Sequence, residues 1–317
     1  MNRKAIRKKV GSTGWTVLLY YVLMNVCAVV GMFIETAVAM AGALPNDMNA
    51  MYDAAMEDSG GAWGYIAATV IGMVILLSWK KRRYWRDQIW AKGRPMKCGD
   101  FFGILAIFLS GQLFYQIYVI TLEVGLNICG LTMLEGLEQM ASTSDGFGMF
   151  LCIAILAPIT EEILCRGLIL RTLMPFGKKF AIVASAFLFG MFHGNILQIP
   201  FAFLVGLVLG YVAAEYSIAW AMVLHMINNL VVGDMLTRLA PGEVVSSVLL
   251  WVIILICAVA AIIVVARRWK EIAAWSRTNA VVPGVYRCFF SSGGVITFTV
   301  LMAVSAIVTC FTIITPK

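Results

Sequence analysis

The sequence has very little charge. Asp, Glu, Lys and Arg together make up 13% of its 317 residues, whereas 61% are hydrophobic and the mean hydropathy is +0.89. An ordinary soluble domain is roughly 25% charged, so this composition excludes a water-soluble enzyme. Apolar runs of about the length that crosses the hydrocarbon core of a bilayer recur along the whole chain. The sequence therefore predicts an all-α, polytopic membrane bundle with about eight or nine transmembrane helices.

Several common signatures of binding and catalysis are also missing. The eight cysteines form no C-x-x-C motif and no Cys/His pairing, which predicts small buried side chains rather than disulfides or a metal cluster. There is no H-E-x-x-H motif, no G-x-S-x-G motif, no phosphate-cradling glycine loop and no internal repeat. The net charge of +7 comes from short connections rather than from one basic stripe, so no nucleic-acid partner is expected.

The hydrophobic runs give the positions of the expected helices. The first run follows a basic tail and is longer than the apolar core of a signal peptide, so we expect it to be retained as a span. The candidate spans lie at about 15–42, 63–79, 101–121, 147–160, 180–193, 198–214, 217–235, 245–266 and 291–314.

The basic residues indicate the orientation of these spans. Of the 24 Lys and Arg residues, 22 fall in the N-terminal tail and in alternate connections, which is typical of cytoplasmic loops. The expected location is therefore the cell membrane of a bacterium, with the N-terminus in the cytoplasm. The basic connection 80–97 has two interpretations: it binds anionic lipid, at about 1 kcal/mol per base, or it only determines the topology.

One stretch places charge inside an apolar run. Residues 156–170 read "LAPITEEILCRGLIL", and a charged side chain within a span costs roughly 2.5 to 3.5 kcal/mol, which makes it a candidate for function. Glu162 and Arg166 are four residues apart and so can pair on one face of a helix. Glu161 points about 100° away from that face. This carboxylate therefore has no local partner and is the candidate for chemistry.

The chain contains only two histidines, and both lie in or at the end of apolar runs. They are His193 in "FGMFHGN" and His225 in "VLHMINN". Asn229 is four residues beyond His225 and shares its helical face. Two intramembrane histidines beside an unpaired glutamate favour a catalytic site over helix packing alone.

This set of side chains fits two mechanisms of amide hydrolysis. A carboxylate and an imidazole can deprotonate water, while a second imidazole and an amide donate hydrogen bonds to the oxyanion. Alternatively, Glu161, His193 and His225 are a possible ligand set for one divalent metal ion, such as zinc, that activates the water. The residues alone do not separate these two.

Three short motifs then occur in order. They are E-E-x-x-x-R at 161–166, F-x-x-x-H at 189–193 and H-x-x-x-N at 225–229. Their order and spacing resemble the CPBP family, the CAAX proteases and bacteriocin-processing enzymes also called Abi proteins, over about residues 156–232. The resemblance implies an all-helical intramembrane endopeptidase with a membrane-associated peptide or protein as its substrate.

The resemblance also implies roles for individual residues. Glu161 would activate the water together with His193, and His225 with Asn229 would stabilise the oxyanion. A metal ion stays an open alternative. Three residues would support the site: Glu162, Arg166 and Phe189.

The expected organisation has three parts. Residues 1–145 hold N-terminal helices and the basic connection, 146–235 form the catalytic core, and 236–317 hold C-terminal helices. Two other functions remain open: a non-catalytic membrane partner or immunity protein of the same family, and a proton-coupled transporter. The absence of a second E-E-x-x-x-R region disfavours the transporter, and no feature selects among prenylated tails, bacteriocin precursors and peptide pheromones as substrates.

Overall fold

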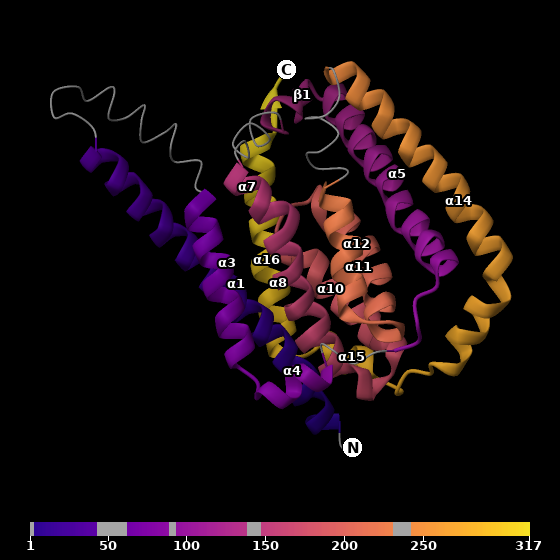
Figure 1. Ribbon diagram of the computed structural model, residues 1–317. Coiled ribbons are helices and arrows are strands. Elements are labelled where there is room, and N and C mark those ends of the chain that lie inside the picture. Colours follow the sequence, from indigo (N-terminus) through magenta and orange to yellow (C-terminus); the bar gives the residue numbers. More distant parts are fainter. Residues whose placement is uncertain (1–2, 43–61, 89–92, 138–146, 231–241) are drawn as a thin grey trace.

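The computed structural model is an almost entirely helical bundle (Figure 1). Six helices are long and apolar enough to cross a membrane, and two shorter apolar helices accompany them in the part of the chain that the structure describes. The expected all-α membrane bundle is confirmed, while the number of eight or nine spans stays a prediction. The structure describes residues 3–42, 62–88, 93–137, 147–230 and 242–317.

The elements run up and down the bundle. The first half contains α1 (Arg3–Gly42), α3 (Ala62–Ser78), α4 (Arg82–Gln88), α5 (Cys98–Ile128) and β1 (Leu131–Thr132). One long helix follows, built from α7 (Phe147–Leu151), η1 (Cys152–Leu156), α8 (Ala157–Glu162), η2 (Ile163–Leu170), α9 (Arg171–Leu173) and η3 (Met174–Phe176). The rest comprises α10 (Lys178–Phe192), α11 (Gln198–Glu215), α12 (Ile218–Asn228), α14 (Glu243–Thr278), α15 (Val285–Phe290), α16 (Gly293–Ile313) and β2 (Thr315–Pro316), which pairs antiparallel with β1.

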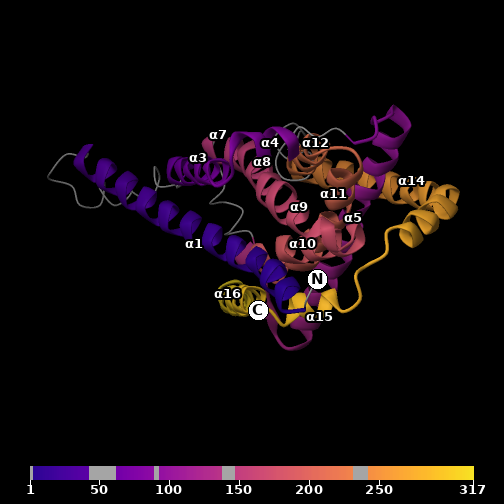
Figure 2. The same cartoon turned by 90° about the horizontal axis from the view of Figure 1, so that it is seen from below.

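The helices form a centre and two flanks. Seen from below, α8, α10, α11 and α12 occupy the middle, with α1, α3 and α16 on one side and α5 and α14 on the other (Figure 2). The closest pairings are α10 with α11, α1 with α3 and α5 with α14. The charged and imidazole side chains of the three sequence motifs therefore lie on the central helices or directly after them.

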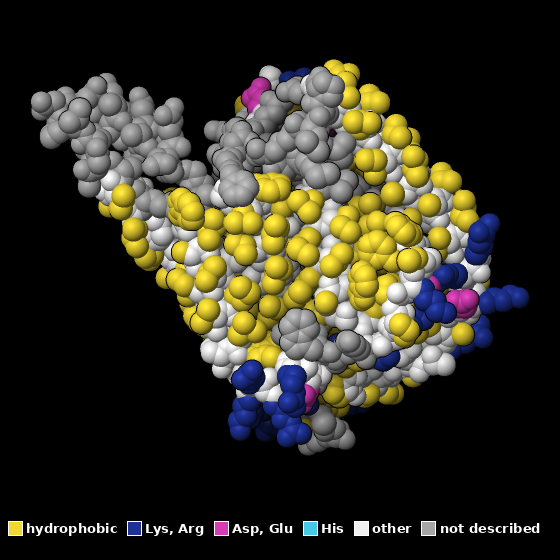
Figure 3. Space-filling view, viewed as in Figure 1, with side chains coloured by type: hydrophobic (Ala, Val, Ile, Leu, Met, Phe, Trp, Pro, Cys, Tyr) yellow, Lys and Arg dark blue, Asp and Glu magenta, His cyan; other side chains and the backbone are white. Residues whose placement is uncertain are grey.

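Large apolar side chains cover the outside of the bundle (Figure 3). Phe33, Ile262 and Phe311 are 67%, 70% and 82% exposed, values that would be unfavourable in water but suit contact with lipid tails. The chain is therefore a multi-pass membrane protein.

Lys and Arg side chains gather mainly at the end of the bundle that holds the N-terminus, α4 and the lower part of α14 (Figure 3). This is the asymmetry that the basic connections predict. Most of the acidic residues in the connections at the other end of the bundle lie outside the described residues.

Four predicted helix limits were wrong, one of them in α5, which continues past residue 121 to Ile128. The span expected at 147–160 continues to Phe176, so Glu161 lies near the middle of a span rather than at its end. The first helix begins at Arg3 within the basic tail, and α14 continues past residue 266 to Thr278. Each predicted limit stopped at charged residues, but a helix satisfies its own backbone hydrogen bonds whether its side chains are charged or apolar.

The long central helix widens just before Pro158. In the π-helical segment η1 the amide of Ala157 donates to the carbonyl of Cys152, five residues back. The same register would pair the carbonyl of Ile153 with residue 158, but proline has no N–H to donate. The carbonyl of Ile153 is therefore left for a partner outside its own helix.

Glycines bring the first and last helices of the bundle into backbone contact. A Cβ at Gly14 in α1 would overlap the backbone of Gly294 in α16, and a Cβ at Gly294 would overlap the carbonyl of Gly11. Small residues permit such close crossings of membrane helices. At the neighbouring Gly293, by contrast, a Cβ would meet nothing within 4 Å.

Candidate active site

A buried ion pair lies at the centre of the bundle. Arg166 Nη1 is 3.1 Å from Glu162 Oε1, and both side chains are 0% exposed. This is the pair expected from the four-residue spacing, and it is confirmed. Arg166 also donates from Nη2 to the carbonyl of Gly206 at 3.1 Å and stacks on the ring of Phe189 at 4.4 Å. These contacts compensate a charge that would otherwise be costly to bury.

His225 lies between the two adjacent glutamates. Its Nδ1 is 3.1 Å from Glu162 Oε1, and its Nε2 is 3.8 Å from Glu161 Oε2. Since the Glu162 carboxylate accepts, Nδ1 carries the proton in this hydrogen bond. The two carboxylates, which leave the helix in different directions, therefore contact the two nitrogens of one imidazole.

The contact between Glu161 and His225 is longer than a hydrogen bond. Glu161 is 19% exposed at its side chain, whereas Glu162 is fully buried. Glu161 is thus the carboxylate of the pair that can be reached.

His193 follows α10 as its C-terminal cap and is half-buried. Its Nδ1 lies 3.0 Å from the carbonyl of Phe189, so this nitrogen donates and Nε2 keeps its lone pair. The Phe189 ring makes edge contacts with both imidazoles, at centroid distances of 5.1 Å to His193 and 5.6 Å to His225. Phe189 therefore contacts His193, His225 and Arg166 with a single ring.

Asn229 is held by a chain of amides. Gln112 on α5 donates to Asn228 Oδ1 at 2.9 Å, and Asn228 donates to Asn229 Oδ1 at 3.1 Å. Asn229 Nδ2 then donates to the carbonyl of Ile153 at 2.9 Å, the carbonyl released by Pro158. Because an amide nitrogen has two hydrogens, Asn229 keeps one N–H for another acceptor.

Three residues that shape the candidate site were not identified from the sequence. Gln112 and Asn228 are buried polar residues in apolar segments, and that signal alone could have identified them. Gly206 gave no signal: a Cβ there would lie 3.1 Å from the Phe189 ring, so glycine allows α11 to approach α10 and present its carbonyl to Arg166.

The expected action of Glu161 together with His193 on a water molecule stays a prediction. The ion-pair contact that Glu161 makes within 4.0 Å among the described residues is with His225. The sequence fixes the spacing along each helix but not the rotation of α12 against α8. Phe189 lies against both histidines, Glu162 contacts His225, and Arg166 contacts Glu162 and Phe189.

Residues 143–231 match the family model described as type II CAAX prenyl endopeptidase Rce1-like. The resemblance to the CPBP family is confirmed. The chain is also 23% identical over 223 residues to YdiL, a candidate membrane peptidase of Bacillus subtilis (strain 168). The aligned region covers 68% of this chain and 85% of YdiL. No solved structure matches the chain. The matched region contains the ion pair, both histidines and Asn229, and the match supports a CAAX-protease type of membrane peptidase.

Proposed function

We propose that this protein is an intramembrane endopeptidase that hydrolyses a peptide bond of a membrane-associated peptide or protein. The observation that carries the proposal is the arrangement of Glu161, Glu162 and His225. A buried, ion-paired glutamate orients the imidazole, and the accessible glutamate faces the imidazole's other nitrogen. A simple packing role would need neither the second carboxylate nor its accessibility.

In the proposed reaction Glu161 is the general base. A water molecule between Glu161 and the imidazoles would lose its proton to the carboxylate as it attacks the peptide carbonyl. The lone pair on His193 Nε2 supports this step because it can accept the water's second hydrogen bond. This keeps Glu161 and His193 in the roles that the family resemblance implies.

His225 and Asn229 are the proposed donors to the oxyanion. When His225 carries protons on both nitrogens, Glu162 holds Nδ1–H and Nε2–H is free to donate to negative charge on the substrate oxygen. The unused N–H of Asn229 is a second donor, and the amide chain from Gln112 fixes its direction. Fixed donors of this kind stabilise a developing oxyanion without reorganising.

A metal mechanism would need Glu161, His193 and His225 to converge on one ion. As arranged, no three His, Cys, Asp or Glu side chains of the described residues come together as a ligand set. The present arrangement does not fit a resident metal, and the proposed steps use the protein's own groups.

The proposal is tested with membranes from cells that lack this protein. Purified protein in detergent is incubated with them, and new peptide termini are identified by mass spectrometry. We expect cleavage products with the natural chain and none with His193→Ala or His225→Ala, provided that both variants insert and fold. Activity should persist after exhaustive chelation, since no step passes through a metal. If both variants retain full biological activity, the protein is instead a non-catalytic membrane partner.

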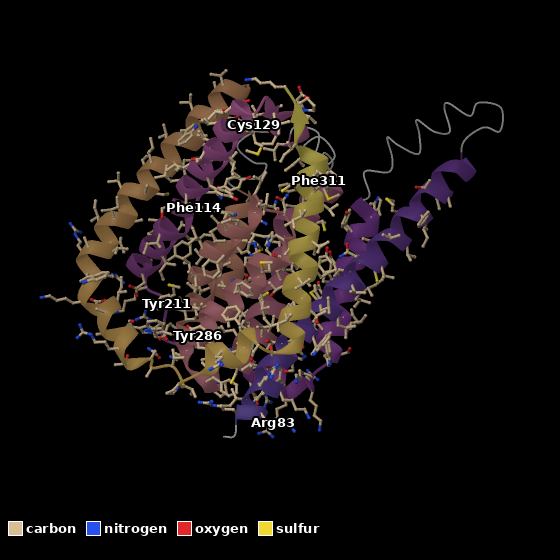
Figure 4. The ribbon with its side chains drawn as sticks, turned by 180° about the vertical axis from the view of Figure 1, so that it is seen from behind. Arg83, Phe114, Cys129, Tyr211, Tyr286 and Phe311 are labelled. Atoms are coloured by element: carbon tan, nitrogen blue, oxygen red, sulfur yellow. The ribbon has the colours of Figure 1, made fainter. Side chains whose placement is uncertain are left out.

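The proposed orientation places the N-terminus and the basic end of the bundle in the cytoplasm. Two natural cysteines at opposite ends of α5 test this orientation. Cys98 is the first residue of α5, Cys129 directly follows its last residue, and both cysteines are exposed. Figure 4 shows Cys129 at the end of the bundle opposite Arg83. In intact cells, a membrane-impermeant maleimide should label a variant whose only cysteine is Cys129 and spare one whose only cysteine is Cys98. The reverse labelling would overturn the orientation.

A further inference from the structure

A cavity of about 500 Å³ lies at the basic end of the bundle, away from the glutamates and histidines. It opens between α1, the α3–α4 turn and the end of the long central helix. Its size is within the range of small-molecule sites, roughly 300 to 1,000 Å³. Its lining residues are Lys9, Ser12, Thr13, Thr16, Trp79, Lys80, Tyr84, Leu168, Ile169, Arg171, Thr172 and Pro175.

Three cations converge on this cavity: Lys9, Lys80 and Arg171. None of them has a carboxylate within 4.0 Å among the residues that the structure describes. The two lysines lie over aromatic rings, 5.9 Å from Phe176 and 5.6 Å from Tyr84. Like charges gathered without a counter-charge repel one another, so an anion in the cavity would be stabilised.

Arg171 lines the cavity with a guanidinium that the protein holds in place. Its Nη2 donates to the carbonyl of Ala213 at 3.1 Å, and its Nη1 to the sulfur of Met174 at 3.4 Å. Its Nε is buried and has no hydrogen-bond partner in the described structure. Because Nε is not accessible, an anion in the cavity would be stabilised by the positive charge of Arg171 rather than by this N–H.

Hydroxyl groups form a stripe on α1, on the same face as Lys9 and across the cavity from Lys80 and Arg171. Ser12, Thr13 and Thr16 lie three or four residues apart with Lys9 and therefore share a helical face. Ser12 and Thr16 donate their hydrogens to backbone carbonyls of α1, at 2.7 and 2.9 Å. Their oxygens are left as acceptors for a ligand that carries its own hydroxyl groups.

The walls of the cavity are fixed by hydrogen bonds. Tyr84 donates to the carbonyl of Gly167 at 2.9 Å, and Trp85 donates to the carbonyl of Leu77 at 2.6 Å. Burial raises the pKa of the Tyr84 phenol, against the opposing charge of Arg171, so the phenol keeps its proton at neutral pH. Trp79, which is 43% exposed at the end of α3, is typical of residues at the membrane surface.

We propose that this cavity binds the headgroup of an anionic phospholipid, with the phosphate among Lys9, Lys80 and Arg171. The hydroxyl groups of a glycerol headgroup would donate to Ser12 and Thr16. The position at the end of apolar helices, the apolar wall of Leu168 and Ile169, and the aromatic Trp79 favour a lipid over a soluble phosphate. The proposal does not depend on peptidase activity.

The test compares lipids on delipidated protein in detergent, with native mass spectrometry reporting bound molecules. We expect one phosphatidylglycerol to bind each chain with preference over phosphatidylcholine, and to raise the melting temperature. The double variant Lys9→Gln/Lys80→Gln should bind phosphatidylglycerol at least about tenfold more weakly, since each base near the surface contributes about fivefold.

A matched variant separates this cavity from general surface charge. Arg267→Gln/Lys270→Gln removes the same charge from exposed positions on α14 and should change binding less than twofold. Equal weakening in both double variants would overturn the proposal. Binding of soluble glycerol phosphate as tight as that of the lipid would also overturn it, because the cavity would then be a site for a free phosphate ester.

Discussion

Replacing Glu161 by glutamine is expected to lower the rate of peptide hydrolysis by about 10²- to 10⁴-fold, the usual contribution of a general base. Glutamine keeps the size and polarity of the side chain but does not accept a proton from water at neutral pH. Glu161 makes no pair with Arg166, so the variant leaves the buried ion pair intact. The rate is measured by mass spectrometry on the cleavage products identified with the natural chain.

A control is offered by Glu271, an exposed glutamate on α14. Glu271→Gln should hydrolyse the same products at the natural rate. Both variants should melt at the same temperature as the natural chain. Full activity of Glu161→Gln would rule out a general base at this position, whatever the fate of the histidine variants.

The second large effect is on stability. Arg166→Met should reduce the free energy of unfolding by about 3 to 5 kcal/mol, because it leaves the fully buried Glu162 without its cation. It also removes the hydrogen bond to the Gly206 carbonyl and the stacking on Phe189. Denaturation in detergent, followed by circular dichroism, measures the loss.

Two further variants isolate the buried charge as the cause. Glu162→Gln/Arg166→Met removes both charges and should recover much of the lost stability, although His225 then loses its carboxylate and activity should stay low. Arg83→Met breaks an exposed pair with Asp87, in which the arginine is 85% exposed, and should leave unfolding unchanged. A double variant no more stable than Arg166→Met alone would contradict the assigned role of the charge pair.

The fold was predicted well where hydropathy decides it. Apolar runs predict membrane helices because the bilayer forces every backbone group to be satisfied within the helix. The predicted helix ends were wrong where charged residues occur inside a helix. Nothing near Glu161 and Glu162 in sequence reveals that α11 and α12 supply a carbonyl and an imidazole to this cluster.

The sequence predicts candidate residues for the site but not the contact between Glu161 and His225. The rarity of charge and histidine identified Glu161, His193 and His225. The contact of Glu161 with His225 depends on how α12 is rotated against α8, and the hydrogen bond from Gln112 to Asn228 ties α12 to α5. The use of the Ile153 carbonyl depends on the local helix register at Pro158, which a standard α-helical pattern does not predict.

The glycine contact between α1 and α16 has a consequence for biosynthesis. α1 leaves the ribosome well before α16, so the Gly14–Gly294 crossing forms only after the helices between them have been synthesised. The hydrogen bond from Arg7 to the carbonyl of Ser291 closes at the same late stage. Until then α1 is held by neighbours that are made earlier, chiefly α3, and the described residues that line the cavity between α1 and the central helix extend only to Pro175. The cavity can therefore form before the glycine crossing locks α1 against α16.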